Sequence, residues 1–212
     1  MKIIDNFVKD RRLLNDMQDL SNKEFWHEGY SWWHNSSPTI TLRHRLIDYM
    51  WLQGKFELPE PLIGFEHWTG IYDAEEKISY QDHVDHSHFE HIQADKKGSK
   101  KFALIHHYDK DEGLYNDTGE IVSPSIGCIY YPILKQKCKG GKLRVYDAEP
   151  GEQAYDAPFE TVDPVPNRLI IFNPGILHAV EQVTKGSRFA IAINLWSKAL
   201  STTQMNEMID AQ

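Results

Sequence analysis

The feature that most constrains the fold of this chain is a series of short apolar segments in its second half. From residue 100 onward, segments of strand length follow one another at near-regular spacing, separated by turn residues such as Gly and Pro. The segments are Phe102–Tyr108, Ile126–Tyr131, Lys142–Tyr146, Arg168–Phe172, Leu177–Val183 and Ser187–Trp196. This pattern predicts an antiparallel sandwich or a double-stranded β-helix (jelly-roll) barrel.

The first hundred residues combine helical and strand patterns. Apolar residues at helical spacing predict one helix from Lys9 to Leu20 and another from Thr41 to Gln53, after a short strand over Lys2–Asn6. The aromatic stretch Phe25–Trp33 is interpreted as core or lid packing, and Ser201–Asp210 is expected to form a short terminal helix. We therefore predict a mainly β, α+β fold in which N-terminal helices support the barrel.

The length of the chain suits one domain. Its 212 residues can bury a core of their own, and contents of 41% hydrophobic and 25% charged residues are ordinary for a globular protein. We expect a single domain over residues 1–212. Within it, residues 1–100 would supply support and substrate-side elements, and residues 101–196 would form the barrel core.

Charge and cysteine content argue against several kinds of partner. The net charge of -8 comes from 23 Lys and Arg against 31 Asp and Glu. Neither nucleic acid nor an anionic membrane is an expected partner, because both attract positively charged surfaces. Cys128 and Cys138 offer no disulfide framework. No stretch approaches the roughly 20 apolar residues of a membrane span, and no signal-peptide pattern is present, so we expect a cytoplasmic protein.

Two His-x-Asp triplets, His83-Val-Asp85 and His107-Tyr-Asp109, are candidate metal-binding motifs. Residues i and i+2 of a strand share one face, so each triplet places an imidazole beside a carboxylate. With a remote histidine they form a two-histidine, one-carboxylate iron site, which leaves positions open for oxygen and a co-substrate. The second triplet is favoured because it ends the apolar segment Phe102–Ile105. The first would insert an extra strand into the barrel order.

Two further residues that could bind a ligand follow the triplet in the sequence. His178 comes at the edge of a predicted strand, and Arg188 lies on the next one. An arginine there can form a bidentate pair with the carboxylate of a bound acid. His106 precedes His107 and therefore points to the opposite face of its strand, so a structural role is expected for it.

The order of these motifs from residue 102 to 196 resembles the catalytic core of the 2-oxoglutarate- and Fe(II)-dependent oxygenases, and most of all the prolyl 4-hydroxylase-like group. The resemblance is carried by Cys128-Ile-Tyr-Tyr131, Gly140-Gly-Lys-Leu-Arg-Val145, His178 and Arg188, in this order. It implies that His107, Asp109 and His178 bind Fe(II). It also implies that Arg188 and Tyr131 bind the distal carboxylate of 2-oxoglutarate.

The same resemblance implies the reaction. The chain would be a dioxygenase that uses Fe(II), 2-oxoglutarate and O₂, with ascorbate as a further possible cofactor, and releases succinate and CO₂. Because Asp109 is present, hydroxylation of an unactivated C–H bond is favoured over halogenation, which needs that position empty. The expected substrate is a peptidyl proline, another side chain or a small molecule. The sequence does not predict the oligomeric state.

The chain departs from the family pattern at two places. Pro132 stands where the family often has Leu, and the loop from Lys110 to Val122 is long enough to be a lid or a substrate loop. We also interpret a set of apolar residues as walls that keep water out of the barrel. They are Ile129, Leu143, Ile171 and Ile193.

Two other functions compete with this interpretation. A cupin-type barrel would bind metal through the same His and Asp residues without 2-oxoglutarate, but it has no need for Arg188. A zinc-binding interaction module could use the cluster His83, Asp85, His86, His88 and His91, although it lacks the Cys ligands common in structural zinc sites. If His107 and Asp109 are the iron ligands, that cluster is expected to be a polar surface loop, a second metal site or a substrate-facing wall.

Overall fold

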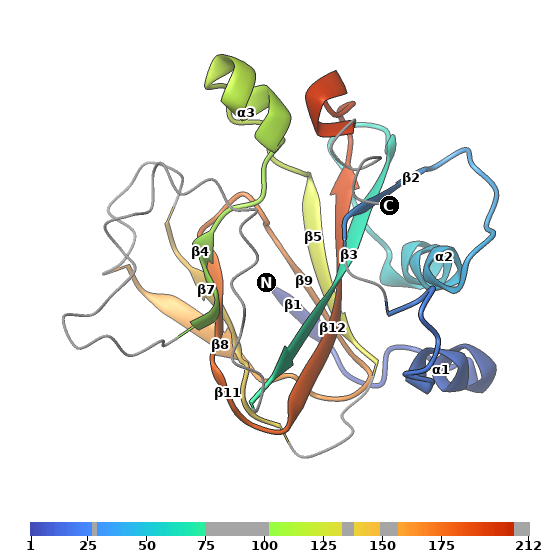
Figure 1. Cartoon of the computed structure of the whole chain (residues 1–212). Helices are drawn as coiled ribbons and strands as arrows, with labels where there is room; N and C mark the ends of the chain where they lie inside the picture. The colour runs from blue at the N-terminus through green and yellow to red at the C-terminus, as the bar shows by residue number, and fades with distance from the viewer. Residues whose placement is uncertain (27–28, 75–101, 133–137, 149–156, 206–212) are drawn as a thin grey trace.

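Two facing β-sheets form the body of the molecule, and two helices pack outside the larger sheet (Figure 1). The computed structural model describes residues 1–26, 29–74, 102–132, 138–148 and 157–205. Its elements are β1 (Lys2–Ile4), α1 (Arg11–Gln18), β2 (Ser31–His34), α2 (Leu42–Gly54), β3 (Gly64–Asp73), β4 (Phe102–His107), α3 (Glu112–Thr118), β5 (Ile126–Tyr131), β6 (Lys139–Gly140), β7 (Leu143–Tyr146), β8 (Phe159–Val162), β9 (Arg168–Phe172), β10 (His178–Glu181), β11 (Val183–Lys185) and β12 (Ser187–Trp196).

The chain crosses repeatedly between the two sheets after β1 to β3 have all joined the larger one. The larger sheet has the order β1-β9-β5-β12-β3-β2 and the smaller has the order β4-β10-β7-β8. From β4 to β12 the chain passes back and forth between them, and the strand pairs in both sheets are antiparallel. This is the mainly β, double-stranded β-helix fold that the sequence predicts.

Strand β12 lies inside the larger sheet, and its two faces meet different surroundings. It pairs with β3 along its whole length and with β5 on its other side. Ile191, Ile193 and Leu195 belong to the core that the helices cover, whereas Ala190 and Ala192 line a cavity between the sheets. Successive residues of a strand point to opposite faces, so one strand serves both the core and the cavity.

The same alternation corrects the prediction of the barrel walls. Ile129 and Leu143 do pack in the apolar cluster between the sheets and line the cavity. Ile193 and Ile171 instead belong to the outer core or pack against it, on the helix side of the larger sheet. The sequence shows that these four residues are apolar. It does not show which face of its strand each residue occupies, because that depends on the strand register.

Both predicted N-terminal helices form, with capped ends. The Asp10 carboxylate accepts hydrogen bonds from the backbone N–H groups of Arg12 and Leu13, and Thr41 caps α2 in the same way. Lys55 ends α2 with a left-handed backbone, φ 50°. The helices bury one apolar face each against the larger sheet, through Leu13, Met17, Leu46, Ile47 and Met50.

Strands β2, β3, β6 and β8 were not predicted. The most consequential is β3, whose sequence Gly-Phe-Glu-His-Trp-Thr-Gly-Ile-Tyr-Asp carries no regular apolar alternation. It forms because all ten of its residues pair with β12. The predicted strand Leu177–Val183 is split, because the chain leaves β10 at Gln182 and pairs with β6 as β11.

The segment from Lys110 to Val122, predicted as a loop, contains the helix α3. Asp111 caps its first turn by accepting a hydrogen bond from Leu114 N at 2.8 Å, and Gly119 ends it with φ 75°. The second carboxylate oxygen of Asp111 accepts a hydrogen bond from Ser201 N at 2.6 Å. The segment is therefore a capped helix tied to the C-terminal part of the chain.

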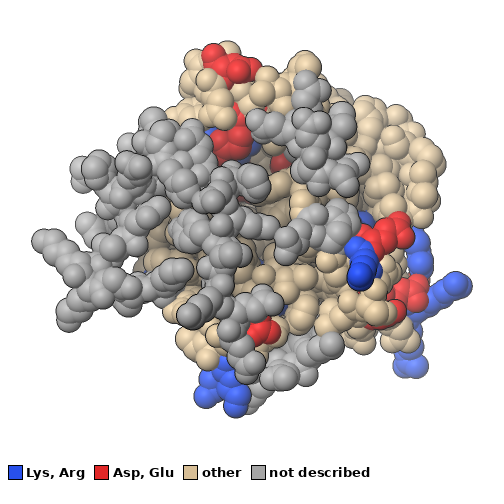
Figure 2. Space-filling model, in the orientation of Figure 1, with Lys and Arg blue, Asp and Glu red and all other residues tan. Residues whose placement is uncertain are grey.

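Charged side chains of both signs lie near one another on the face that Figure 2 shows, around α1 and α2. Arg45 and Asp16, for example, form an ion pair of 3.2 Å between the two helices. No described helix combines the length and apolarity needed to cross a membrane.

Asn167 ties the N-terminal segment to the barrel. Its Oδ1 accepts hydrogen bonds from Val8 N at 2.8 Å and Tyr130 Oη at 2.9 Å, and its Nδ2 donates to the Val8 carbonyl at 3.0 Å. Its backbone is left-handed, φ 56°, a conformation that Asn tolerates better than most residues. One side chain thus satisfies both backbone polar groups of Val8.

Replacing Asn167 by Ala should lower the free energy of unfolding by about 2–3 kcal/mol, because three hydrogen bonds are lost and buried groups stay unpaired. Asn167→Asp keeps the accepting oxygen and should cost less. Urea denaturation of the two variants measures the difference. Equal losses would mean that the hydrogen bonds accepted by Oδ1 of Asn167 do not account for the effect.

Candidate active site

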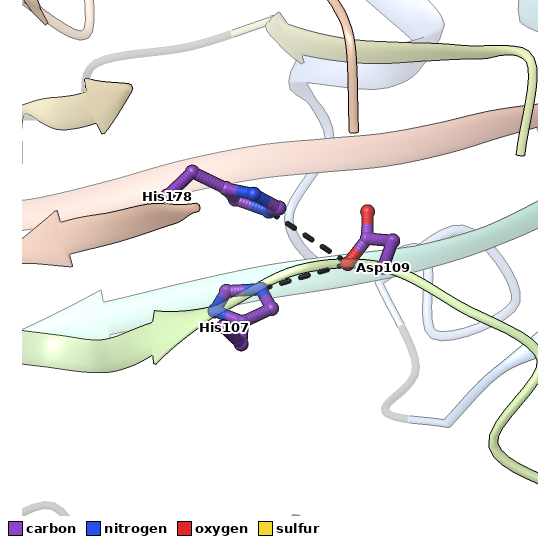
Figure 3. A group of neighbouring side chains, drawn as sticks. All are labelled: His107, Asp109 and His178. Carbon is purple, nitrogen blue, oxygen red and sulfur yellow. Dashed lines mark ion pairs between the residues drawn. The ribbon is translucent and has the colours of Figure 1, made fainter. Parts of the chain in front are cut away.

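His107, Asp109 and His178 converge at the edge of the smaller sheet (Figure 3). His107 ends β4, His178 begins β10, and the two residues stand directly opposite each other in the antiparallel register. Asp109 follows two residues after His107. Its Oδ1 lies 3.6 Å from Nε2 of His107 and 3.7 Å from Nε2 of His178.

Each imidazole is fixed by a backbone carbonyl. Nδ1 of His107 lies 2.8 Å from the Ile105 oxygen, and Nδ1 of His178 lies 2.9 Å from the Ile176 oxygen. A carbonyl oxygen only accepts, so each Nδ1 donates, and Nε2 is the atom of each imidazole that faces Asp109 and can bind a metal. Burial, together with the neighbouring His178, lowers the pKa of His107 to about 4, which keeps it neutral at pH 7.

This donor set fits a divalent transition metal. Bonds from such an ion to imidazole nitrogen or carboxylate oxygen are about 2.1 Å long, so one ion can join two atoms that lie up to about 4.2 Å apart. Both distances from Asp109 to the histidines are within that span. Backbone hydrogen bonds that fix the tautomer are the usual outer support of metal-binding histidines.

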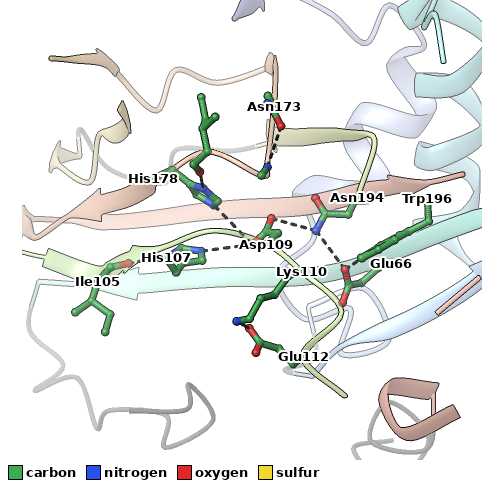
Figure 4. Close-up of polar contacts among 12 residues, drawn as sticks. Glu66, Ile105, His107, Asp109, Lys110, Glu112, Asn173, His178, Asn194 and Trp196 are labelled. Atoms are coloured by element: carbon green, nitrogen blue, oxygen red, sulfur yellow. Dashed lines mark hydrogen bonds and ion pairs between the residues drawn. The ribbon is translucent and has the colours of Figure 1, made fainter. Parts of the chain in front are cut away.

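The carboxylate is held from the side of the larger sheet. The backbone N–H of Asp109 donates to the Pro174 carbonyl at 2.9 Å. Oδ2 of Asp109 accepts a hydrogen bond from Asn194 Nδ2 at 3.1 Å, and the same nitrogen donates to Glu66 at 3.2 Å (Figure 4). Trp196 Nε1 also donates to Glu66. Two strands of the larger sheet, β3 and β12, therefore support a group that follows β4.

A cavity extends from these residues into the barrel and reaches Arg188 on β12. Arg188 is only 2% exposed, and its Nε donates to the Gly141 carbonyl at 3.1 Å. Its Nη2 donates to Tyr131 Oη at 3.3 Å, and its guanidinium lies against the rings of Tyr131 and Tyr72, 5.1 and 5.4 Å from their centroids. Among the described residues no carboxylate forms an ion pair with this buried cation, which suits it to bind an acid.

A match to a family model shows which class of protein the chain belongs to. The model of the 2OG-Fe(II) oxygenase superfamily matches residues 70–196, more than half of the chain. The chain belongs to this superfamily. Fe(II) and 2-oxoglutarate are accordingly the cofactors of this oxygenase.

Solved structures similar to the oxygenase include a prolyl 4-hydroxylase from Pseudomonas putida, with a TM-score of 0.53, 14% identity and coverage of 93% of this chain and 92% of that one. A viral collagen prolyl hydroxylase from Paramecium bursaria Chlorella virus-1 has a TM-score of 0.47 and 11% identity, over 92% and 88% of the chains. A prolyl hydroxylase from Trichoplax adhaerens has a TM-score of 0.46 and 13% identity, over 100% and 86%. No curated protein sequence matches the oxygenase.

The sequence also contains His106 and the cluster from His83 to His91. His106 points to the opposite face of β4, where its Nε2 lies 2.7 Å from Tyr146 Oη, as expected for a structural residue. The cluster from His83 to His91 lies outside the described residues, so its predicted roles stay predictions.

Sequence reasoning missed Tyr72, Glu66 and Asn194. Tyr72 and Glu66 lie on β3, and the register with β12 places Tyr72 opposite Arg188 and Glu66 opposite Asn194. For Asn194 the sequence did hold a signal, which is its place in the alternation Arg188, Ala190, Ala192, Asn194 along β12. All four positions share one face and line the cavity.

Glu66 makes the stability of the metal-free oxygenase depend on pH. Burial and then the charge of Asp109 raise the pKa of Glu66 from 4.5 to about 8. The folded protein therefore keeps this carboxyl protonated at pH 7, whereas the unfolded chain ionises it. Its favourable contribution to stability is complete below pH 4.5 and is lost as the pH rises through about 8.

Glu66→Gln, which is neutral at every pH, should weaken this dependence. Between pH 5 and pH 8.5 the free energy of unfolding of the metal-free variant should fall less than that of the wild type. Urea denaturation at several pH values measures it, and Glu57→Gln, at an exposed position, is the matched control. Parallel pH curves for wild type and Glu66→Gln would contradict the raised pKa.

Proposed function

We propose that the chain is a hydroxylase that binds Fe(II) through His107, Asp109 and His178 and oxidises an unactivated C–H bond. The observation that carries this proposal is the convergence of three ligand atoms with both imidazole tautomers fixed by carbonyl oxygens. The carboxylate position is filled by Asp109, which favours hydroxylation over halogenation. When bound, the metal and 2-oxoglutarate would supply an O₂-dependent oxidation in which one oxygen atom enters succinate as CO₂ leaves and the other oxygen atom enters the substrate.

Arg188 and Tyr131 bind the distal carboxylate of 2-oxoglutarate in this proposal. Both residues are buried, and they form a hydrogen bond with each other. Arg188 lines the same cavity as the metal-binding residues, and Tyr131 packs in the apolar cluster of the cavity wall. Tyr72 packs its ring against the guanidinium from the other side. Together these residues orient the co-substrate, and the apolar residues Ile129 and Leu143 limit the access of water.

The proposed substrate is a side chain of a peptide, with proline as the first candidate. Trp68 lines the cavity, and its ring centroid lies 4.9 Å from that of Tyr30, which is 43% exposed. An aromatic wall that extends from the cavity to the surface suits a small apolar ring. The Trichoplax adhaerens prolyl hydroxylase was solved with a peptide fragment of hypoxia inducible factor.

The cupin-type alternative from the sequence, a barrel that binds metal without 2-oxoglutarate, is not supported, because the model of the 2OG-Fe(II) oxygenase superfamily matches residues 70–196. It shares the metal ligands but gives Arg188 no anion to bind. Dependence of the iron spectrum on 2-oxoglutarate distinguishes the two.

The ligand set predicts which variants lose iron. Under anaerobic conditions, Fe(II) followed by 2-oxoglutarate should produce the weak visible charge-transfer band of a chelate in the wild type. His107→Ala and His178→Ala should lose the band, because each removes one ligand, and His83→Ala should retain it. A band that survives in His178→Ala would move the metal site elsewhere, and stoichiometric iron without any band would favour the cupin-type alternative.

Arg188→Ala should weaken the binding of 2-oxoglutarate about 10- to 100-fold and leave Fe(II) stoichiometry unchanged, because it removes the charge-assisted hydrogen bonds to the far carboxylate. Titration of the charge-transfer band measures the affinity. Arg144→Ala is the matched control, since Arg144 pairs with Glu181 on the smaller sheet at 2.7 Å. Equal co-substrate affinity in Arg188→Ala and wild type would transfer this role to another residue.

A further inference from the structure

We propose that Asn194 is a positioning residue that limits Asp109 to one ligand atom. It would hold Oδ2 of Asp109 away from the metal and leave Oδ1 facing the two histidines. The inference rests on the metal-binding role proposed above for His107, Asp109 and His178. It adds a residue that the family motif of His-x-Asp, His and Arg does not contain.

The two oxygens of Asp109 have different surroundings. Oδ1 is the atom near both imidazoles, 3.6 and 3.7 Å from their Nε2 atoms. Oδ2 accepts a hydrogen bond from Asn194 Nδ2 at 3.1 Å. Rotation of the carboxylate that brought Oδ2 toward the histidines would break this bond. Asn194 therefore stabilises the orientation in which only Oδ1 is presented.

Glu66 fixes the orientation of the Asn194 amide. The Nδ2 group has two hydrogens, and it donates one to Asp109 and one to Glu66 Oε2, the latter at 3.2 Å (Figure 4). The Asp109 carboxylate can only accept, so the amide nitrogen of Asn194 faces it, since the amide oxygen cannot donate. Glu66 is held in turn by Trp196 Nε1 at 3.2 Å. Asn194 and Trp196 are 2% and 1% exposed, so this network is shielded from water.

The number of ligand atoms matters for this chemistry. A two-histidine, one-carboxylate site needs open positions for the co-substrate and oxygen. A carboxylate that binds through both oxygens occupies one more of them. Hydrogen-bond partners of metal ligands typically change metal affinity by about 10- to 100-fold when they are removed. Asn194 therefore sets the affinity of the site for the metal. It also keeps a coordination position of the metal open for the co-substrate or oxygen.

Strand β12 links this role to the co-substrate. Asn194 and Arg188 lie on the same face of β12, with Ala190 and Ala192 between them lining the cavity. One strand thus carries the group that orients the metal ligand and the group proposed to bind the far carboxylate. The small side chains between them leave room for a bound acid.

The test is the Fe(II) affinity of Asn194→Leu, a change that keeps a similar volume and removes the donor. Anaerobic competition with a coloured chelator should show binding about 10- to 100-fold weaker than in the wild type. The charge-transfer band with 2-oxoglutarate should shift in energy, which simple loss of stability does not produce. Asn22→Leu is the matched control, because Asn22 caps the turn at Phe25 in the N-terminal region and should leave both readouts unchanged.

A folded Asn194→Leu protein with wild-type iron affinity and an unshifted band would overturn the inference. Failure of the underlying metal assignment gives a different result, because the wild type itself would then bind no Fe(II) or His178→Ala would bind it normally.

The wild type provides a second test if Asn194→Leu does not fold. With diamagnetic Zn(II) in place of Fe(II), both assigned side-chain amide protons of Asn194 should exchange slowly with solvent and shift when the metal is added. Fast exchange of either proton, or no shift, would overturn the inference.

Discussion

The site depends on one antiparallel pairing, between the end of β4 and the start of β10. This register places His107 opposite His178, and each imidazole is then fixed by the carbonyl oxygen two residues before it. A slip of one residue would turn one imidazole to the opposite face of the sheet, where His106 lies. Asp109 needs the same pairing, because its backbone is held by Pro174 in the turn that leads into β10.

The larger sheet supplies the other polar side chains of the site. Strand β12 packs Ile191 and Ile193 against the helix-covered core, and on its other face it presents Arg188 and Asn194 to the cavity. The helices therefore contribute to the site indirectly, by burying the back of the strand that carries these two polar groups. A displacement of β12 would affect the metal end and the Arg188 end of the cavity together.

The sequence predicts the parts of the structure whose signals are local. Ile126–Tyr131, Arg168–Phe172 and Ser187–Trp196 form strands with the predicted bounds, because each is an apolar run that turn residues delimit. Strand β3 lacks such a signal and owes its existence to pairing with β12, so the contributions of Glu66 and Tyr72 were not predictable. The face of Ile171 and Ile193 was undetermined for the same reason. The three candidate metal ligands were named from a motif order that resembles the oxygenase family, and the structure brings these three residues together.

A crystal structure with Mn(II), a redox-inert substitute for Fe(II), and 2-oxoglutarate would show whether these three residues hold the metal. We expect one ion bound by Nε2 of His107, Nε2 of His178 and Oδ1 of Asp109. We also expect the far carboxylate of 2-oxoglutarate within hydrogen-bond distance of Arg188. An ion held by other residues, or a co-substrate that leaves Arg188 uncontacted, would contradict this assignment.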